Sequence, residues 1–328
     1  MGPAATGAGL ALSLPTRSGS HGSDLARLAR EAEEAGFEAV YIAERVADSL
    51  AICHHLLAET TTIAVGTAVA NARARQPVVA AMTAMTLQET SGGRFRLGLG
   101  VANAHLNEER LGLPPVSPAA WMAEYVEVVR QTCAGGPVHV HGTYFRVDGL
   151  ELDRTVPVPV PVHLAALQHG MLGLAGRVAD GVILNLCPVE AVGRRLRHLR
   201  EAAARRAPGL PEPEVACVIP CCVSDDAELA LAAARDVVLD YMLHPAAAAL
   251  YGEAGDPELV SAVQARLAAG HREAAADLVP DELVDRFVAH GPPAACAEQV
   301  ARYRAAGVRT PIVFPRPVGR RWADAVWE

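Results

Sequence analysis

The chain has 328 residues and a formal net charge of −8, and it is 51% hydrophobic and 20% charged. All 29 basic residues are arginine, so there is no lysine to serve as a Schiff base, a P-loop phosphate ligand or a general base. The acidic balance argues against nucleic-acid or anionic-membrane partners, which attract basic surfaces. The composition is that of a globular protein, and the length fits either two average domains or one barrel.

The start of the chain lacks the charged-then-apolar pattern of a secretory signal. No apolar run approaches the length that spans a bilayer. We therefore expect a cytoplasmic protein whose ligand is a small molecule.

Cysteine and histidine usage gives no sign of a disulfide framework or of a metal site. The seven cysteines are scattered, with only Cys221 and Cys222 adjacent, and we expect reduced thiols in the core. His139 and His141 point to one face of a predicted hairpin strand, but no third ligand accompanies them. We interpret them as a solvated surface pair and expect no metal.

The first half of the chain alternates strand and helix patterns. Ser23 can cap the first helix, Gly36 is placed to end it, and Pro77 opens a later one. The predicted strands cover 8–14, 39–43, 63–69 and 95–100, and the predicted helices cover about 23–36, 48–59, 77–92 and 117–133. This order implies parallel, buried strands.

The second half resumes the alternation after a small hairpin at 139–147. Strands are predicted at 160–166, 182–185, 215–223 and 310–314, and helices at 170–179, 189–206, 281–289 and 294–306. The stretch 225–276 has an almost wholly helical pattern and is too long for a simple loop. Eight strands favour a (β/α)8 TIM barrel over an open doubly wound sheet, as one domain over 1–328 with a helical insertion after strand seven.

In such a barrel the active site lies at the carboxyl ends of the strands. The residues expected there include Glu44, Asn71, Asn103 and His105, of which few are strong acids or bases. Neither a nucleophile elbow nor the third glycine of a dinucleotide fingerprint is present. A polar but weakly ionisable rim is typical of a site whose cofactor brings the reactive chemistry.

Three local features are candidates for that site. His105 follows the fourth strand and is either an acid or substrate contact or an ordinary surface residue. Glu44 is either functional or part of a structural ion pair with Arg45 or Arg73. The segment 163–171 leads into a helix whose backbone N–H groups could bind a phosphate without lysine.

Residues 67–103, TAVANARARQPVVAAMTAMTLQETSGGRFRLGLGVAN, resemble the core of the bacterial luciferase-like monooxygenase superfamily. The match is best to its branch of coenzyme F420-dependent oxidoreductases. The resemblance rests on Val-Ala-Asn at a strand end, Arg-x-x-x-Pro at the next helix, Thr-Leu-x-Glu-x-Ser-Gly-Gly-Arg-Phe, and Leu-Gly-Leu-Gly. It continues at 164–185 and 299–315 and is weakest in the helical insertion.

The resemblance implies a dimeric TIM barrel that transfers a hydride between F420 and a small organic substrate, with the insertion covering the substrate. It also implies a non-prolyl cis peptide at Ala68–Val69, in a bulge that supports the cofactor's tricyclic ring. His105 or Glu108 would be the proton donor. The implied cofactor-binding residues are Glu44, Ala68, Val69, Asn71, Asn103 and Asn107, with Ala166, Leu167, Gln168, His169, Gly170 and Met171 around the phosphate.

Two positions depart from the family pattern. Relatives usually follow the strand-two acid with His, where this chain has Arg45, and the sugar-phosphate dehydrogenases carry a catalytic Glu where this chain has Asn103. A sugar dehydrogenase is therefore not expected. The alternatives are an FMN-dependent two-component monooxygenase and a non-catalytic flavin-binding homologue.

Overall fold

The computed structural model describes residues 9–16, 22–45, 47–243, 245–254 and 257–319. The chain divides into two compact units. The first unit runs to Ile183 and includes Arg197–Glu214, and the second comprises Leu184–Leu196 and the residues from Val215 onward.

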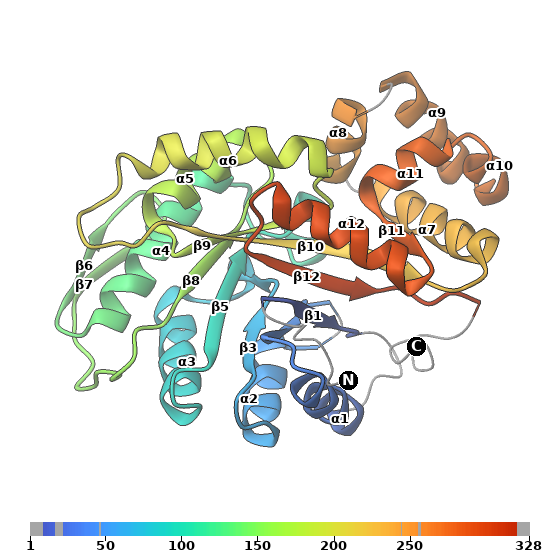
Figure 1. Cartoon of the computed structure of the whole chain (residues 1–328). Helices are drawn as coiled ribbons and strands as arrows, with labels where there is room; N and C mark the ends of the chain where they lie inside the picture. The colour runs from blue at the N-terminus through green and yellow to red at the C-terminus, as the bar shows by residue number, and fades with distance from the viewer. Residues whose placement is uncertain (1–8, 17–21, 46, 244, 255–256, 320–328) are drawn as a thin grey trace. The chain divides into compact units, whose positions relative to one another are not determined.

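The first unit is built from a parallel sheet with helices between its strands. Its elements are β1 (Ala11–Leu14), α1 (Gly22–Glu34), β2 (Ala39–Ile42), α2 (Ser49–Glu59), β3 (Ala64–Thr67), β4 (Ala70–Asn71), the 3-10 turn η1 (Ala72–Ala74), α3 (Pro77–Thr90), β5 (Phe95–Gly100), the π-helical turn η2 (His105–Arg110), α4 (Pro118–Ala134), β6 (Val138–His141), β7 (Arg146–Leu150), β8 (Val162–Ala165) and α5 (His169–Val178). Strands β1, β2, β3, β5 and β8 pair in parallel in that order. Figure 1 shows β3, β5 and β8 side by side, with α2 and α3 next to them.

The second unit contains the remaining strands and the helical insertion. Strand β9 (Gly181–Asn185) and helix α6 (Val189–Ala203) contribute residues to both units. The other elements are β10 (Glu214–Val223), α7 (Ala227–Met242), α8 (Pro245–Ala254), α9 (Pro257–Ala268), α10 (Arg272–Ala276), α11 (Asp281–Phe287), β11 (Ala289–Gly291), α12 (Pro293–Ala305) and β12 (Thr310–Pro315). Strand β10 pairs in parallel with both β11 and β12.

The predicted fold class is confirmed. In the described part of the chain, the parallel strands β1, β2, β3, β5, β8, β9, β10 and β12 are those of an α/β TIM barrel. Helices α7 to α10 follow β10, the seventh of these strands, as the predicted insertion does. Strand β11 was not expected: α11 ends at Phe287, and after Val288 the residues Ala289–Gly291 pair with β10. Three residues are too few to show a strand pattern, so only this pairing makes them a strand.

Local sequence signals explain why the helices beside the site begin and end where they do. The Asp48 carboxylate accepts the N–H groups of Leu50 and Ala51 and so caps α2. At the other end of α2, the Arg94 guanidinium donates to the carbonyls of Leu57 and Thr60. Arg94 belongs to the Ser-Gly-Gly-Arg-Phe motif, so this motif satisfies carbonyls that a helix end leaves free.

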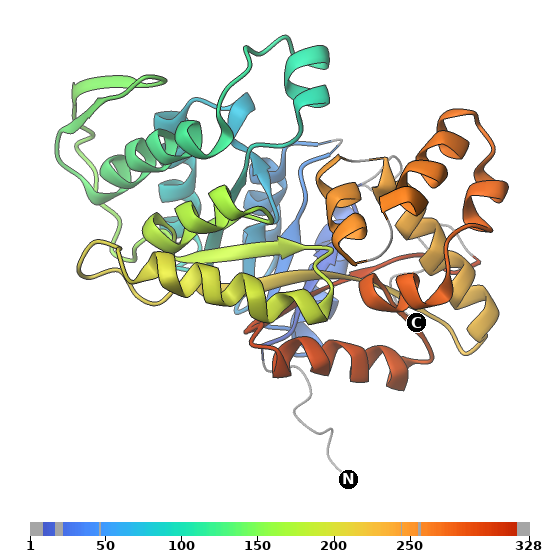
Figure 2. The ribbon, with the colours of Figure 1, turned by 90° about the horizontal axis from the view of Figure 1, so that it is seen from above.

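The predicted hairpin at 139–147 is confirmed, with strands β6 and β7 pairing antiparallel. The Glu124 carboxylate accepts the N–H groups of Thr143, Tyr144 and Phe145 and holds its turn. In Figure 2 this hairpin (green) and the segment that carries η2 (teal) both extend beyond the strands of the first unit. Among the described helices, none combines the length and apolar character needed to cross a membrane.

Candidate active site

Most of the residues expected in the site lie in the first unit, just after β2, β3, β5 and β8. Because these strands pair in parallel, their carboxyl ends share one edge of the sheet. This edge is where a TIM barrel places its chemistry. The unit therefore brings segments that are far apart in the sequence to one side of the sheet.

The end of β3 forms the predicted bulge, and the Ala68–Val69 peptide bond is cis, as the resemblance implied. The bulge passes very close to β5. A Cβ on Gly98 would lie 1.9 Å from the Thr67 carbonyl oxygen, and one on Gly100 would lie 2.5 Å from Val69 Cγ2. The Leu-Gly-Leu-Gly motif therefore has glycine where side chains would displace the bulge.

The ion-pair partner of Glu44 is Arg75, and the expected pairs with Arg45 or Arg73 do not form. Arg75 Nη1 lies 2.6 Å and 2.7 Å from the two carboxylate oxygens, and both side chains are largely buried. Burial lowers the pKa of Arg75, but the hydrogen bond and the charge of Glu44 raise it more, so the guanidinium stays protonated. Arg45 is exposed, and Arg73 instead donates to the Pro114 carbonyl.

Three asparagines connect the bulge to η2. The buried Asn71 donates through Nδ2 to Oδ1 of the buried Asn107, at 3.2 Å. Asn107 in turn donates to the Val101 carbonyl, and Asn103 Oδ1 accepts the Leu106 N–H. These amides fix the loop after β5, and Asn103 remains exposed.

The two candidate proton donors lie on η2. His105 is exposed, with Nδ1 2.8 Å from the Glu109 carboxylate and Nε2 3.1 Å from Arg110 Nε. Glu108 is exposed as well. A π-helical turn is rare and occurs frequently at functional sites.

The expected phosphate segment, Ala166 to Met171, spans the end of β8 and the first turn of α5. Gln168 occupies the N-cap but makes no side-chain capping bond, and Gln168, His169 and Gly170 are exposed. The first N–H groups of the helix thus lack a side-chain cap, which fits an anionic ligand. Among the described residues outside the backbone of α5 itself, Ala119 Cβ at 3.8 Å is the one contact within 4 Å of a Cβ built on Gly170, so the turn is open.

Sequence reasoning missed three residues at this edge. Arg75 is the counter-ion of Glu44. Tyr125, on α4, is fully buried, and its hydroxyl has no hydrogen-bond partner in the described part of the chain. His198 stacks on His169, with ring centroids 3.6 Å apart, and its Nε2 lies 3.0 Å from the His169 carbonyl oxygen. The one sequence signal for Arg75 is its position inside the Arg-x-x-x-Pro motif that follows the third strand.

An open groove of about 760 Å³ lies on the outside of the first unit, between α2 and α3. Its exposed apolar residues include Val79 and Met82, and Asp48 and Arg75 also line it. Arg75 therefore lies between this groove and Glu44.

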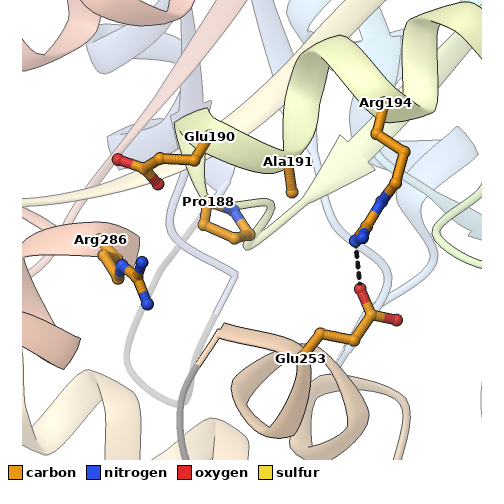
Figure 3. Close-up of a pocket in the computed structure, with 6 residues that line it drawn as sticks. All are labelled: Pro188, Glu190, Ala191, Arg194, Glu253 and Arg286. Carbon is orange, nitrogen blue, oxygen red and sulfur yellow. Dashed lines mark hydrogen bonds and ion pairs between the residues drawn. The ribbon is translucent and has the colours of Figure 1, made fainter.

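The second unit has a cavity of about 300 Å³ at the start of α6 (Figure 3). Arg194 and Glu253 form an ion pair across it at 2.7 Å, and Arg286 and Glu190 also line it. Both carboxylates have arginine partners, since Glu190 pairs with Arg302. The lining of the cavity therefore carries charges of both signs.

His139 and His141 both contact the exposed Asp148 across the hairpin. Over the described ranges, no three or more His, Cys, Asp or Glu side chains are arranged to hold a metal ion.

Comparison with known proteins adds the following likenesses. A profile of the family described as luciferase-like monooxygenase matches residues 9–310. A Mycobacterium tuberculosis protein, named as a candidate coenzyme F420-dependent oxidoreductase, is 30% identical over 312 residues, which cover 88% of this chain and 89% of that protein. The 5,10-methylenetetrahydromethanopterin reductase of Methanopyrus kandleri is 26% identical over 313 residues, covering 90% of this chain and 89% of that protein. The solved structure of the F420-dependent tetrahydromethanopterin reductase from Methanopyrus kandleri has a TM-score of 0.84 at 24% identity, over 98% of this chain and 96% of that one.

Proposed function

The chain belongs to the luciferase-like monooxygenase family, and on that premise we propose that it transfers a hydride between the deazaflavin coenzyme F420 and a small organic substrate. The names of the relatives support this choice of cofactor, since a Mycobacterium tuberculosis protein and a Methanopyrus kandleri structure are both named for F420. The observation in this chain that carries the proposal is the uncapped first turn of α5 at the carboxyl edge of the sheet.

The residues at that edge fit a phosphate-bearing cofactor. The N–H groups of His169, Gly170 and Met171 would bind the phosphate, at a helix end whose partial positive charge favours an anion. Gln168 and the backbone of Ala166 and Leu167 would complete this segment. No lysine is needed, because the donors are backbone amides.

The bulge at Ala68 and Val69 would support the ring, with Asn71 and Asn107 behind it. Both bulge residues keep part of their surface exposed, whereas Asn71 and Asn107 are buried and bonded to each other. We therefore assign the ring contact to the main chain of the bulge and a supporting role to the two amides.

When bound, F420 supplies a carbon centre that accepts or donates a hydride in a two-electron step. The chain supplies the proton that accompanies it, and His105 and Glu108 are our candidates. In this structure His105 Nδ1 faces Glu109, which can hold a proton at that nitrogen. Asn103 remains at the family's catalytic Glu position and cannot ionise, so sugar-phosphate oxidation is not part of the proposal.

We also propose that the protein is a homodimer and acts in the cytoplasm. The outward surface of helix α3 includes the exposed apolar residues Val79 and Met82, which line the groove together with Thr83 and Thr86. Exposed apolar side chains that gather in a groove are typical of a surface that a partner covers. A second copy of the chain on α2 and α3 would provide that cover.

The function is tested by titrating the purified protein with F420 and, separately, with FMN, following cofactor fluorescence. We expect saturable binding of F420 and weak binding of FMN. Tight FMN binding without F420 binding, together with oxygen uptake in the presence of reduced FMN, would contradict the proposal and support a two-component monooxygenase. Binding of neither cofactor would support a non-catalytic homologue.

A further inference from the structure

We propose that Glu44 and Arg75 are a positioning pair that fixes the bulge at Ala68 and Val69 through contacts to Val69 and Asn71, and that neither residue is an acid or base in the reaction. This inference rests on the proposed function, in which the bulge supports the cofactor ring. It assigns a role to Arg75, which the sequence did not single out. It also gives Glu44 a positioning role in place of the direct cofactor contact that the resemblance implied.

Glu44 holds both ends of the bulge. Its backbone N–H donates to the Val69 carbonyl at 3.3 Å, and its side-chain Oε2 accepts the Asn71 N–H at 2.8 Å. One residue at the end of β2 therefore sets the separation of two residues on the neighbouring chain segment. A shift of the Glu44 side chain would move Asn71 and, through it, Asn107.

Arg75 fixes the carboxylate in turn. Its Nη1 contacts both oxygens of Glu44, and its Nη2 lies 2.8 Å from Asp48 Oδ1. The same Asp48 oxygen caps α2 by accepting the N–H groups of Leu50 and Ala51. The contacts form a continuous chain from the bulge through Glu44, Arg75 and Asp48 to the first turn of α2.

The oxygens of Glu44 are already used by these contacts. Oε2 accepts from the Asn71 N–H and from Arg75, and it lies 3.3 Å from Ser49 Oγ, while Oε1 accepts from Arg75. Because both oxygens are engaged in this way, the Glu44 side chain is held in one position, which suits a fixed support.

The test uses three variants of the full chain: Glu44→Gln, Arg75→Gln and the double variant. Arg75→Gln leaves the largely buried Glu44 carboxylate without its counter-charge, whereas Glu44→Gln leaves Arg75 still paired with Asp48. The double variant has two amides that can still bond to each other. The matched control is Arg30→Gln, which breaks the exposed Arg30–Glu59 pair at 2.7 Å, outside the site.

Two readouts are measured on each variant. The first is hydrogen–deuterium exchange of the peptide that contains Val69 and Asn71, in the protein without cofactor. The second is the dissociation constant of F420. For Arg75→Gln we expect exchange in this peptide to become about tenfold faster and the dissociation constant to rise about tenfold, with the double variant closer to wild type than Arg75→Gln alone. Arg30→Gln should change neither.

Unchanged exchange at the bulge in all three variants would overturn the proposal. So would a Glu44→Gln variant that binds F420 normally but loses one ionisation from the pH profile of kcat, because that result would make Glu44 an acid or base. A wild-type protein that binds no F420 would contradict the proposed function alone, and the exchange measurement would still decide whether the pair fixes the bulge.

Discussion

Contacts of β3 and its bulge with two glycines of β5 determine how closely these segments approach each other. The Thr67 hydroxyl donates to the Gly98 carbonyl at 2.6 Å and accepts the Gly98 N–H at 2.9 Å. This double contact leaves no room for a side chain at Gly98, and Val69 leaves none at Gly100. The glycines of this motif are therefore explained by packing against the bulge and not by a phosphate loop.

We predict that Gly100→Ala weakens cofactor binding. The added Cβ would meet Val69 Cγ2 at 2.5 Å, so the bulge must move or the valine must change its rotamer. The dissociation constant should rise about tenfold, and the free energy of unfolding should fall by about 1–2 kcal/mol. Isothermal titration and urea denaturation measure the two effects. Gly252→Ala in α8 is the control, since a Cβ there meets no atom of the described residues within 4 Å. Equal losses in both variants would contradict the packing argument.

We predict a pH-dependent stability effect for Glu33. Burial raises the pKa of Glu33, but hydrogen bonds from Thr62, Ile63 and Thr61 lower it more, from 4.5 to about 2. A depressed pKa in the folded state stabilises the protein above pH 4.5, and this contribution is lost as the pH falls toward 2. Glu33→Gln should therefore lower the free energy of unfolding by about 1 kcal/mol at pH 7, a discounted value for a partly exposed group.

Urea denaturation of both proteins between pH 3 and pH 7 checks this. The difference between them should shrink steadily below pH 4.5. A difference that stays constant over this range would mean that the charge of Glu33 has no part in it.

At the scale of the elements, side chains that bond to free backbone groups fix where α2 begins and ends and how the hairpin turns. Arg94 satisfies carbonyls at the end of α2, Asp48 caps its start, and Glu124 holds the hairpin turn. The start of α5 has no side-chain cap, as is also true of α4, α11 and α12, but it lies directly after β8 at the carboxyl edge of the sheet. A helix start left without a side-chain cap, at the edge where the fold places its chemistry, is the feature that the proposed cofactor phosphate would complete.

We predict that His198→Phe weakens binding of the phosphate. The variant keeps an aromatic ring against His169 but loses the contact between His198 Nε2 and the His169 carbonyl, which holds the first residue of α5. The dissociation constant of F420 should rise about threefold to tenfold. The ring-and-ribityl fragment of the coenzyme, which lacks the phosphate, should bind with unchanged affinity. Equal weakening of both ligands would contradict a phosphate-specific effect.

At the scale of the whole molecule, the groove between α2 and α3 exposes apolar side chains that a second copy of the chain would cover. Val79 is 58% exposed and Met82 is 44% exposed, beside the half-buried Thr83 and Thr86. We predict that Val79→Asp shifts the protein from dimer to monomer in sedimentation experiments. Thr90→Asp, at the exposed end of the same helix and outside the groove, is the control. A wild-type protein that sediments as a monomer would rule out the dimer.

The sequence by itself determined the order of the eight barrel strands, the TIM barrel, the insertion after strand seven and the family. These follow from apolar periodicity, caps and motifs, all of which are local along the chain. The cis bond at Ala68–Val69 was also expected, through the resemblance.

Only the tertiary structure decided which groups meet at the site. The sequence offered Arg45 and Arg73 as partners of Glu44, and the folded chain instead brings Arg75, after η1, to its carboxylate. His198 reaches His169 only because α6 packs beside α5, and β11 exists only because β10 lies next to it. Such contacts join residues about thirty or more positions apart, and the geometry of the folded sheet, not any local pattern, fixes them.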